Sequence, residues 1–291
     1  MSLPFDYDSA FERNIGWLTL TEQARLRGKR VAIAGLGGVG GIHLLTLARL
    51  GVERFHIADF DTFGLANFNR QAGAAMSTLD QPKVDVLAAM ARDINPRAQI
   101  GSFARGVDAG NIDAFLDGVD LYVDGLDFFA FDARETMFAA CAARRIPAIT
   151  VAPLGIGAAL LNFLPGGMSF EDYFGWQGQT EREKALRFLV GLAPRVLHAD
   201  YLADASRVDL SARRGPSTIM ACQLCAGIAA AEALKILLGR GRVLTAPHGV
   251  HFDAYRNKLV HTWRPAGHRN PLQRLLMALV RRRMDRLGAG R

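Results

Sequence analysis

Short apolar runs alternate with segments of helical apolar spacing over the first half of the chain. Strands are expected at residues 30–35, 54–59, 99–103, 121–124 and 147–151. Helices are expected between them at residues 39–50, 82–94, 111–116 and 133–145. This alternation predicts an α/β fold of the Rossmann-like, doubly wound class, with a mostly parallel sheet that binds its ligand at the carboxyl ends of the strands.

The alternation stops after Ala152. A less regular stretch extends to Arg214, and four glycines in its first part predict turns: Gly155, Gly157, Gly166 and Gly167. A helix at 218–238, a strand at 250–252 and a hairpin-like tail with Tyr255, Val260, His261 and Trp263 follow. We therefore expect an N-terminal helical arm (1–29), a Rossmann-like nucleotide-binding domain (30–152), a crossover region with a β extension that completes the same domain (153–264) and a basic C-terminal helix (265–291).

Composition indicates a globular protein. The chain has 291 residues, of which 50% are hydrophobic, and can bury a large core. The start lacks a basic stretch followed by an apolar one, so no signal peptide is expected. The apolar segment 219–239 contains Gln223, Glu232 and Lys235, which favours a packed helix over a membrane span. Three cysteines do not suggest a secreted disulfide framework. We expect a cytoplasmic protein.

The net charge of +7 is concentrated in the C-terminal tail. Residues 281–291 contain five arginines and one acid, Asp285. With Leu275, Leu276 and Leu279 at helical spacing, the tail could form a basic amphipathic helix for an acidic partner, a membrane surface or nucleic acid. A helix with a solvated basic face is the simpler interpretation.

A glycine-rich loop, Gly35-Leu-Gly37-Gly38-Val-Gly40-Gly41, lies between the first predicted strand and helix. Glycines there allow a tight turn and let backbone N–H groups approach a phosphate at the positive end of the helix. The loop alone does not distinguish ATP from NAD or FAD. Asp59, at the end of the second strand, is where a dinucleotide enzyme would hold its ribose, so an NAD- or FAD-dependent oxidoreductase remains an alternative.

Charged and amide residues follow the second strand in close succession: Asp59, Asp61, Asn67, Arg70, Gln71 and, further on, Lys83. Arginine and lysine neutralise a polyphosphate, and an aspartate holds ribose or a metal ion. Hydride transfer has no need of this set. An ATP-dependent adenylation does, because charge develops on the leaving pyrophosphate.

These motifs occur in an ordered series: GxGGxG, D-x-D, N-x-N-R-Q, P-K-V and a later D-x-x-D that ends at Asp127. From about residue 11 to 238 the chain resembles the ThiF/MoeB/HesA family of E1-like, ubiquitin-activating-type enzymes. The resemblance implies that Asp59 holds the ATP ribose, that Asn67, Arg70 and Lys83 face the phosphates with Gln71 supporting them, and that Asp127 is the catalytic aspartate associated with Mg²⁺. It also implies a homodimer in which Arg13 enters the partner's ATP site.

The activity that the resemblance implies is adenylation of a carboxylate by Mg-ATP. The family usually acts on the C-terminal Gly-Gly of a ubiquitin-like or sulfur-carrier protein, and some members act on small peptides or on a modified tRNA base. A nucleotide-binding member without catalysis is a further alternative.

The chain departs from the family pattern at four places. Only one C-x-x-C pair is present, Cys222 and Cys225, inside a predicted helix, so no zinc site is expected. Residues 152–221 contain no cysteine, which excludes thioester transfer there. Arg13 is followed by Asn14 where the family usually has glutamine. Phe128 replaces a polar residue after Asp127, and two interpretations stay open: an apolar acceptor site, or weakened catalysis.

Overall fold

The computed structural model describes residues 4–208 and 213–289, with residues 283–289 described through their backbone alone. The described residues form one sheet of eight strands in the order β3-β2-β1-β4-β5-β6-β7-β8. Strands β1 to β5 are parallel, and β6, β7 and β8 continue the sheet antiparallel. The strand bounds are β1 Arg30–Ala34, β2 Arg54–Ala58, β3 Gln99–Phe103, β4 Leu121–Asp124, β5 Ala148–Leu154, β6 Gly157–Phe163, β7 His248–Asp253 and β8 Lys258–Trp263.

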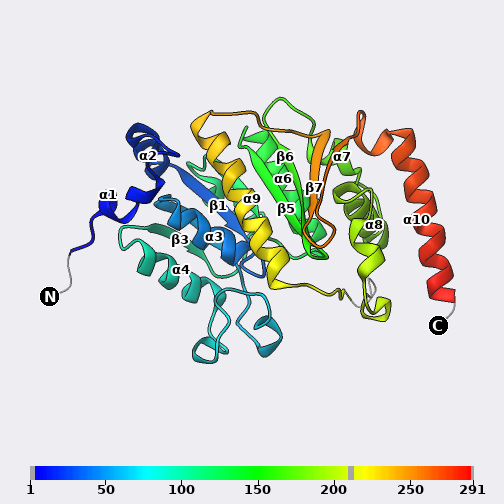
Figure 1. The fold of residues 1–291 in the computed structure, drawn as a ribbon, viewed down its shortest axis with the longest axis horizontal. Helices are drawn as coiled ribbons and strands as arrows, with labels where there is room; N and C mark the ends of the chain where they lie inside the picture. The colour runs from blue at the N-terminus through cyan, green and yellow to red at the C-terminus, as the bar shows by residue number, and fades with distance from the viewer. Residues whose placement is uncertain (1–3, 209–212, 290–291) are drawn as a thin grey trace.

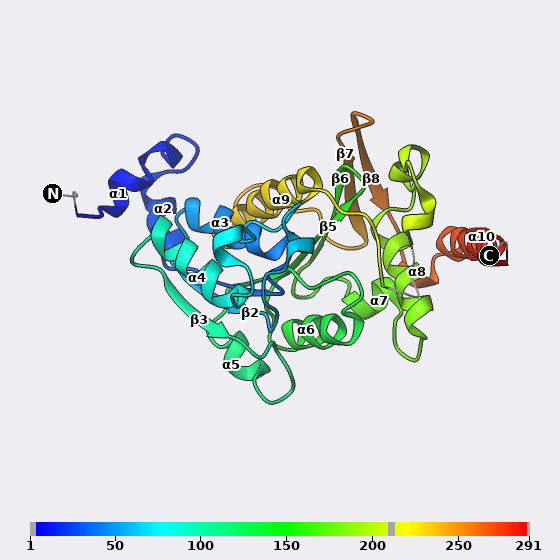
Figure 2. The ribbon, with the colours of Figure 1, turned by 90° about the horizontal axis from the view of Figure 1, so that it is seen from below.

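Helices cover both faces of the sheet (Figures 1 and 2). α3, α4 and α9 lie on one face, and α5, α6, α7 and α8 lie on the other. The helix bounds are α1 Tyr7–Ala10, α2 Leu20–Arg27, α3 Gly40–Arg49, α4 Lys83–Ile94, α5 Ile112–Leu116, α6 Phe131–Ala143, α7 Phe170–Phe174, α8 Glu181–Leu192, α9 Ile219–Leu238 and α10 Pro271–Ala289.

Alternate residues of each central strand enter opposite cores. In β1, Val31 and Ile33 pack with α3 and α9, whereas Ala32 and Ala34 face the core that contains α6. Parallel strands buried on both faces need apolar residues at every position, and the apolar runs of the sequence have that pattern. The predicted Rossmann-like, mostly parallel α/β fold with a C-terminal β extension is confirmed.

One expected turn residue is part of a strand. Gly157 begins β6, which pairs with β5 along its whole length, so the prediction of a turn at Gly157 was wrong. The turn itself is made by Gly155, whose φ of +63° is a conformation that favours glycine. The irregular stretch that we expected after Ala152 therefore opens with a hairpin, and α7 and α8 follow it.

Helix α9 is long and apolar enough to cross a membrane, but 56% of its most apolar window is buried inside the fold. It begins after Thr218, whose hydroxyl caps the helix, and ends at Gly239 in the left-handed conformation. It packs against β5, β6 and α3. The predicted packed helix over this segment is thus a core element.

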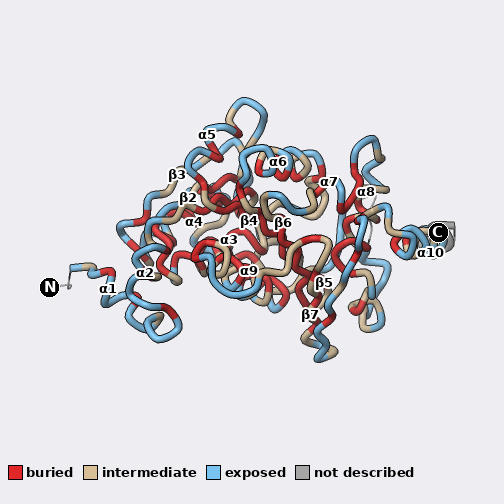
Figure 3. Tube along the Cα trace, turned by 90° about the horizontal axis from the view of Figure 1, so that it is seen from above, coloured by how far each residue is buried: buried red, intermediate tan, exposed pale blue. Residues whose placement is uncertain are grey.

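The two ends of the chain lie at opposite ends of the molecule (Figure 1). In the N-terminal arm, the Tyr7 hydroxyl donates to the Gly51 carbonyl at 2.6 Å and Asn14 donates to the Leu50 carbonyl, so the arm is fixed to the end of α3. At the other end, α10 packs on α8 through Met277 and exposes much of its outer surface (Figure 3). The side chains of Arg283, Arg286 and Arg291 in the basic tail lie outside the described residues.

The buried ring of His43 in α3 makes the stability of this fold sensitive to acid. Both ring nitrogens lack a hydrogen-bond partner among the residues that the structure describes, and burial lowers the pKa of His43 to about 3. In the unfolded chain the pKa of His43 is near its ordinary value of 6.5. Between pH 3 and 6.5 the unfolded state therefore binds more protons at His43 than the folded state does. We expect the free energy of unfolding to fall as the pH drops from 6.5 towards 3, by up to about 1.4 kcal/mol per pH unit from this group.

Urea unfolding across this pH range, compared with that of His43→Met, measures the contribution. His261→Met, at an exposed position, is the matched control. The free energy of unfolding of His43→Met should fall less steeply with decreasing pH than that of the wild type. An equal slope in the two proteins would contradict the role of His43.

Candidate active site

Three glycines bring two loops into backbone contact at the carboxyl edge of the sheet. Gly35 follows β1 and Gly40 begins α3, at the two ends of the glycine-rich loop, and Gly125 follows β4. A Cβ on Gly35 or on Gly125 would overlap backbone atoms of the other loop, and a Cβ on Gly40 would overlap the Gly35 carbonyl. No side chain fits at this junction. The loop that contains Asp127 is therefore held directly against the glycine-rich loop.

The other two predicted glycines border polar side chains of the following segment. A Cβ on Gly37 would lie 3.7 Å from Nε2 of Gln71, and one on Gly38 would lie 3.5 Å from Cδ of Arg70. The structure thus brings the predicted phosphate loop together with the predicted N-x-N-R-Q residues, although more than thirty positions separate them in the sequence.

Asp59 and Asp61 connect the end of β2 to this loop. The carboxylate of Asp59 accepts from the Leu36 amide at 2.6 Å and from the Asp61 amide at 2.8 Å. Asp61 in turn forms an ion pair with the buried Lys83, with 2.9 Å between Oδ2 and Nζ. The ammonium group of Lys83 is thereby fixed at the start of α4, beside a half-exposed carboxylate.

Arg70 keeps an uncompensated positive charge. Its guanidinium donates to the Ala66 carbonyl and to the Asn69 side chain, and it forms no ion pair within residues 4–208 and 213–289. Asn69 also donates to the Ser217 carbonyl at 2.9 Å, just before α9. Asn67 accepts from the Gly64 amide and so stabilises the turn that precedes Arg70. This arrangement leaves Arg70 available to an anion.

Gln71 supplies an independent indication of a ligand. Its side chain is 7% exposed, and its Oε1 atom is buried with no hydrogen-bond partner in residues 4–208 and 213–289. A buried polar atom without a partner is costly in a folded protein. Together with the cationic Arg70 and the glycine-rich loop, it is a feature that fits a bound nucleotide.

Asp127 lies on a loop that a buried arginine organises. Arg134 of α6 forms an ion pair with Asp124 at 2.8 Å and donates to the carbonyls of Leu126, Asp127 and Phe128. Asp124 also accepts from the Thr150 hydroxyl. The carboxylate of Asp127 itself is exposed and accepts from the Phe129 amide at 3.0 Å. Arg134 therefore fixes the backbone of this loop, while the carboxylate of Asp127 stays exposed.

The crossover region borders this loop. The ring of Phe128 packs on Phe188 of α8, with 5.2 Å between the ring centroids. Arg213 forms an ion pair with Glu181, which raises the pKa of Arg213, and the negative charge of Asp127 adds to this effect. Phe128 thus anchors the Asp127 loop to α8, which gives the departure from the family pattern a packing role.

Arg13 is not near the glycine-rich loop of its own chain. It is exposed and lies in the arm that binds the end of α3, about 15 Å of helix away from the loop at the start of α3. Cys222 and Cys225 are both buried in the core. Among the residues that the structure describes, no three His, Cys, Asp or Glu side chains gather so as to hold a metal ion.

Sequence reasoning missed two residues of this site. Arg134 is a fully buried charge in the helix expected at residues 133–145, and no role was predicted for it. The Sγ atom of Cys222 lies 3.1 Å from the position of a Cβ on Gly38, so the start of α9 supports the glycine-rich loop. A charged residue on the inner face of a predicted helix was the one available signal, and it concerned Arg134 alone.

The ThiF family model matches residues 11–275. The chain belongs to the ThiF family. Curated relatives include the tRNA threonylcarbamoyladenosine dehydratase of Bacillus subtilis (strain 168), 35% identical over 43% of this chain and 49% of the relative. The molybdopterin-synthase adenylyltransferase of Escherichia coli (strain K12) is 33% identical over 48% of this chain and 56% of the relative. The chain spans about half the length of these relatives.

Solved structures of the same fold cover more of the chain. Selenomethionine PaaA matches 90% of this chain and 74% of its own, with a TM-score of 0.68 and 17% identity. Escherichia coli MccB with ATP matches 90% of this chain and 74% of its own, with a TM-score of 0.64 and 18% identity. At these identities the likeness concerns the fold of this ThiF family member.

Two substitutions with opposite expected effects on stability test the contact between Gly35, Gly40 and Gly125. Gly40→Ala should destabilise this ThiF family protein by several degrees in Tm, because the new Cβ overlaps the Gly35 carbonyl. Gly227→Ala, at an exposed position of α9 with open space around it, should stabilise by about 0.5–1 kcal/mol. Thermal unfolding by circular dichroism measures both. Equal effects of the two substitutions would mean that the loops are not in close contact.

Proposed function

We propose that this ThiF family protein adenylates a carboxylate with Mg-ATP. The observation that supports the proposal best is the junction at Gly125, where the loop that contains Asp127 contacts the glycine-rich loop. Arg70 borders the same loop at Gly38, and Lys83 is joined to it through Asp61 and Asp59. In the reaction, a carboxylate oxygen attacks the α-phosphorus, a new P–O bond forms, and the bond to the bridging oxygen of the β-phosphate breaks. An acyl-adenylate and pyrophosphate result.

Each residue of the site has a proposed part in this reaction. Arg70 and Lys83 offset the charge of the phosphates as pyrophosphate leaves, because charge-assisted hydrogen bonds are the strong ones in such sites. Asp59 holds the ribose, Asn67 faces the phosphates together with Arg70, and Gln71 supports them. Asp127 would hold Mg²⁺, which neutralises phosphate charge when bound. No protein nucleophile is needed, which agrees with the absence of cysteine from residues 152–221.

The proposed acceptor is the C-terminal carboxylate of a small carrier protein, or of a peptide. Relatives named for such acceptors support this class: the sulfur carrier protein ThiS adenylyltransferase of Escherichia coli (strain K12), and MccB solved with MccA. A modified tRNA base is a less favoured acceptor. The crossover region around Arg213 and α8, which borders Asp127, is where acceptor recognition is proposed. An NAD- or FAD-dependent oxidoreductase would leave Arg70, Lys83 and Asp127 without a role.

Pyrophosphate exchange tests the chemistry. With a carrier protein or peptide that ends in Gly-Gly, the wild type should exchange labelled pyrophosphate into ATP. Arg70→Ala and Asp127→Ala should each lower the exchange rate by about 100-fold or more, because they remove interactions with charge that develops in the transition state. Arg54→Ala, an exposed arginine of β2, is the control. Undiminished exchange in both site variants would contradict the proposed roles.

We further propose that two copies of the chain share their active sites, with Arg13 of one reaching the ATP site of the other. The exposure of Arg13 and its distance from the loop of its own chain support a role in trans. The arm also exposes the apolar side chains of Trp17 and Leu20, at 83% and 71%. Such groups are suited to burial against a second copy.

Complementation between variants tests this sharing. Arg13→Ala and Asp127→Ala should each be nearly inactive alone. Co-expressed, they should regain about a quarter of the wild-type exchange rate, because half of the dimers are mixed and each mixed dimer has one complete site. Absence of recovery, or a monomer in sedimentation at micromolar concentration, would rule out the role of Arg13 in trans.

A further inference from the structure

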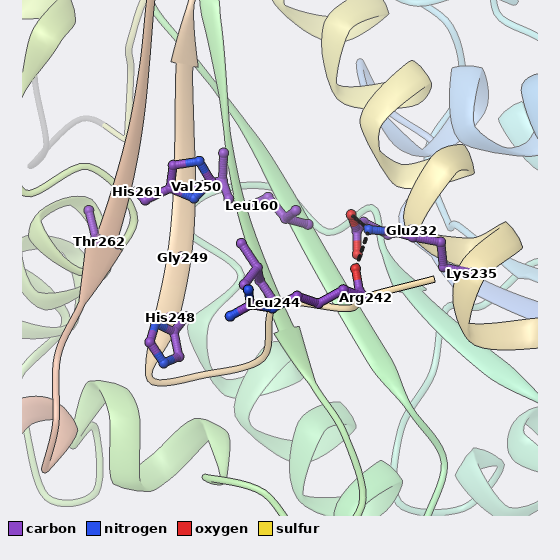
Figure 4. Close-up of a pocket in the computed structure, with 10 residues that line it drawn as sticks. All are labelled: Leu160, Glu232, Lys235, Arg242, Leu244, His248, Gly249, Val250, His261 and Thr262. Carbon is purple, nitrogen blue, oxygen red and sulfur yellow. Dashed lines mark hydrogen bonds and ion pairs between the residues drawn. The ribbon is translucent and has the colours of Figure 1, made fainter. Parts of the chain in front are cut away.

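A pocket of about 550 Å³ opens between the second half of α9 and the antiparallel extension of the sheet (Figure 4). This volume falls in the range of small-molecule sites, roughly 300–1,000 Å³. Its walls come from β6, β7, β8, α9 and the loop that precedes β7. The lining residues used below are Leu160, Glu232, Lys235, Arg242, Val250 and His261.

The sheet side of the pocket combines apolar and imidazole groups. Leu160, Val250 and His261 are direct partners across β6, β7 and β8, so their side chains point to the same face. His248 also lines the pocket and stacks on the exposed Trp263, its partner in β8, with 6.2 Å between the ring centroids. An apolar floor with aromatic and imidazole rings beside it suits a ligand with a flat apolar body.

On the opposite side of the pocket, Arg242 is the one cation without a side-chain partner among the described residues. Glu232 is neutralised, because one oxygen forms an ion pair with Lys235 at 2.5 Å and the other accepts from the buried Asn162. Arg242 has no side-chain hydrogen bond or ion pair within the described ranges 4–208 and 213–289, and it is exposed. Figure 4 shows its side chain extending from the loop towards β7. The net charge of the pocket is therefore positive, and Arg242 is the group that an anion would meet.

This pocket is separate from the candidate active site. Cys222, beside the glycine-rich loop, and Lys235, in the pocket wall, are thirteen residues apart on the same helix, which is about 20 Å at 1.5 Å per residue. A small molecule bound near Arg242 would not reach Arg70 or Asp127.

We propose that the pocket is a second ligand site of this protein, which binds a small molecule that joins a flat apolar body to one carboxylate or phosphate group. The apolar body lies on Leu160 and Val250, and the anionic group pairs with Arg242 through a charge-assisted, bidentate contact. The proposal does not depend on the adenylation reaction, because none of its residues belongs to the candidate active site.

Calorimetric titration with three probes of one shape tests the proposal: 2-naphthoate, 2-naphthyl phosphate and the neutral 2-naphthalenemethanol. At least one anionic probe should bind saturably and about 10-fold or more tightly than the neutral alcohol, which corresponds to one charge-assisted contact. The tighter of the two anions identifies the group as carboxylate or phosphate. Binding should persist in saturating ATP.

Two variants and a control locate the binding. Arg242→Gln removes the charge but keeps the backbone carbonyl that accepts from Lys235. The substitution should lower the affinity for the anionic probes about 10-fold and leave the affinity for the neutral probe unchanged. Val250→Phe fills the apolar floor of the pocket and should lower the affinity for all three probes. The control Arg54→Gln removes a positive charge at an exposed position of β2 and should change none of the three affinities. Probe binding that ATP displaces, that ignores Arg242→Gln, or that fails in the wild type would overturn the proposal.

Discussion

The contact between Gly35, Gly40 and Gly125 is the constraint on which the rest of the site depends. Strands β1 and β4 are neighbours and run parallel, so the loops that follow them emerge at the same edge of the sheet. Only glycine at these positions lets the two backbones touch. The contact sets the distance between the loop proposed to bind phosphate and the loop that contains Asp127. Any residue with a side chain there would separate the two halves of the proposed chemistry.

A buried ion pair stabilises the second of these loops. Arg134 and Asp124 are both almost fully buried, and removing one partner of such a pair leaves an uncompensated charge in the interior. Arg134 also satisfies three carbonyls of the loop, so the pair fixes backbone geometry as well as charge. Asp127 is exposed and Arg70 forms no ion pair with a described residue, and these two are the groups proposed to act on the ligand. The buried Arg134 and Asp124 fix the backbone of this loop, whereas the buried Lys83 and the more exposed Arg70 are the cations proposed to face the phosphates.

The sequence was sufficient where a pattern was regular and local. The five parallel strands and α9 followed from apolar periodicity, and the resemblance to the ThiF/MoeB/HesA family implied that Arg70 and Lys83 face the phosphates. Strand β6 was missed because a glycine begins it. The support of Gly38 by Cys222 and the role of Arg134 depend on how α9 and α6 pack against distant loops. No local pattern encodes such contacts, and the pocket beside Arg242 arises in the same way.

Equilibrium binding of nucleotides tests the central claim most directly, because the glycine-rich loop alone is compatible with both ATP and a dinucleotide. The measurement is a calorimetric titration of the wild-type protein with Mg-ATP and, separately, with NAD⁺, repeated on Asp127→Ala. We expect saturable binding of Mg-ATP that Asp127→Ala weakens, and no heat of binding with NAD⁺. Saturable binding of NAD⁺ that is indifferent to Asp127 would contradict this expectation and indicate an oxidoreductase.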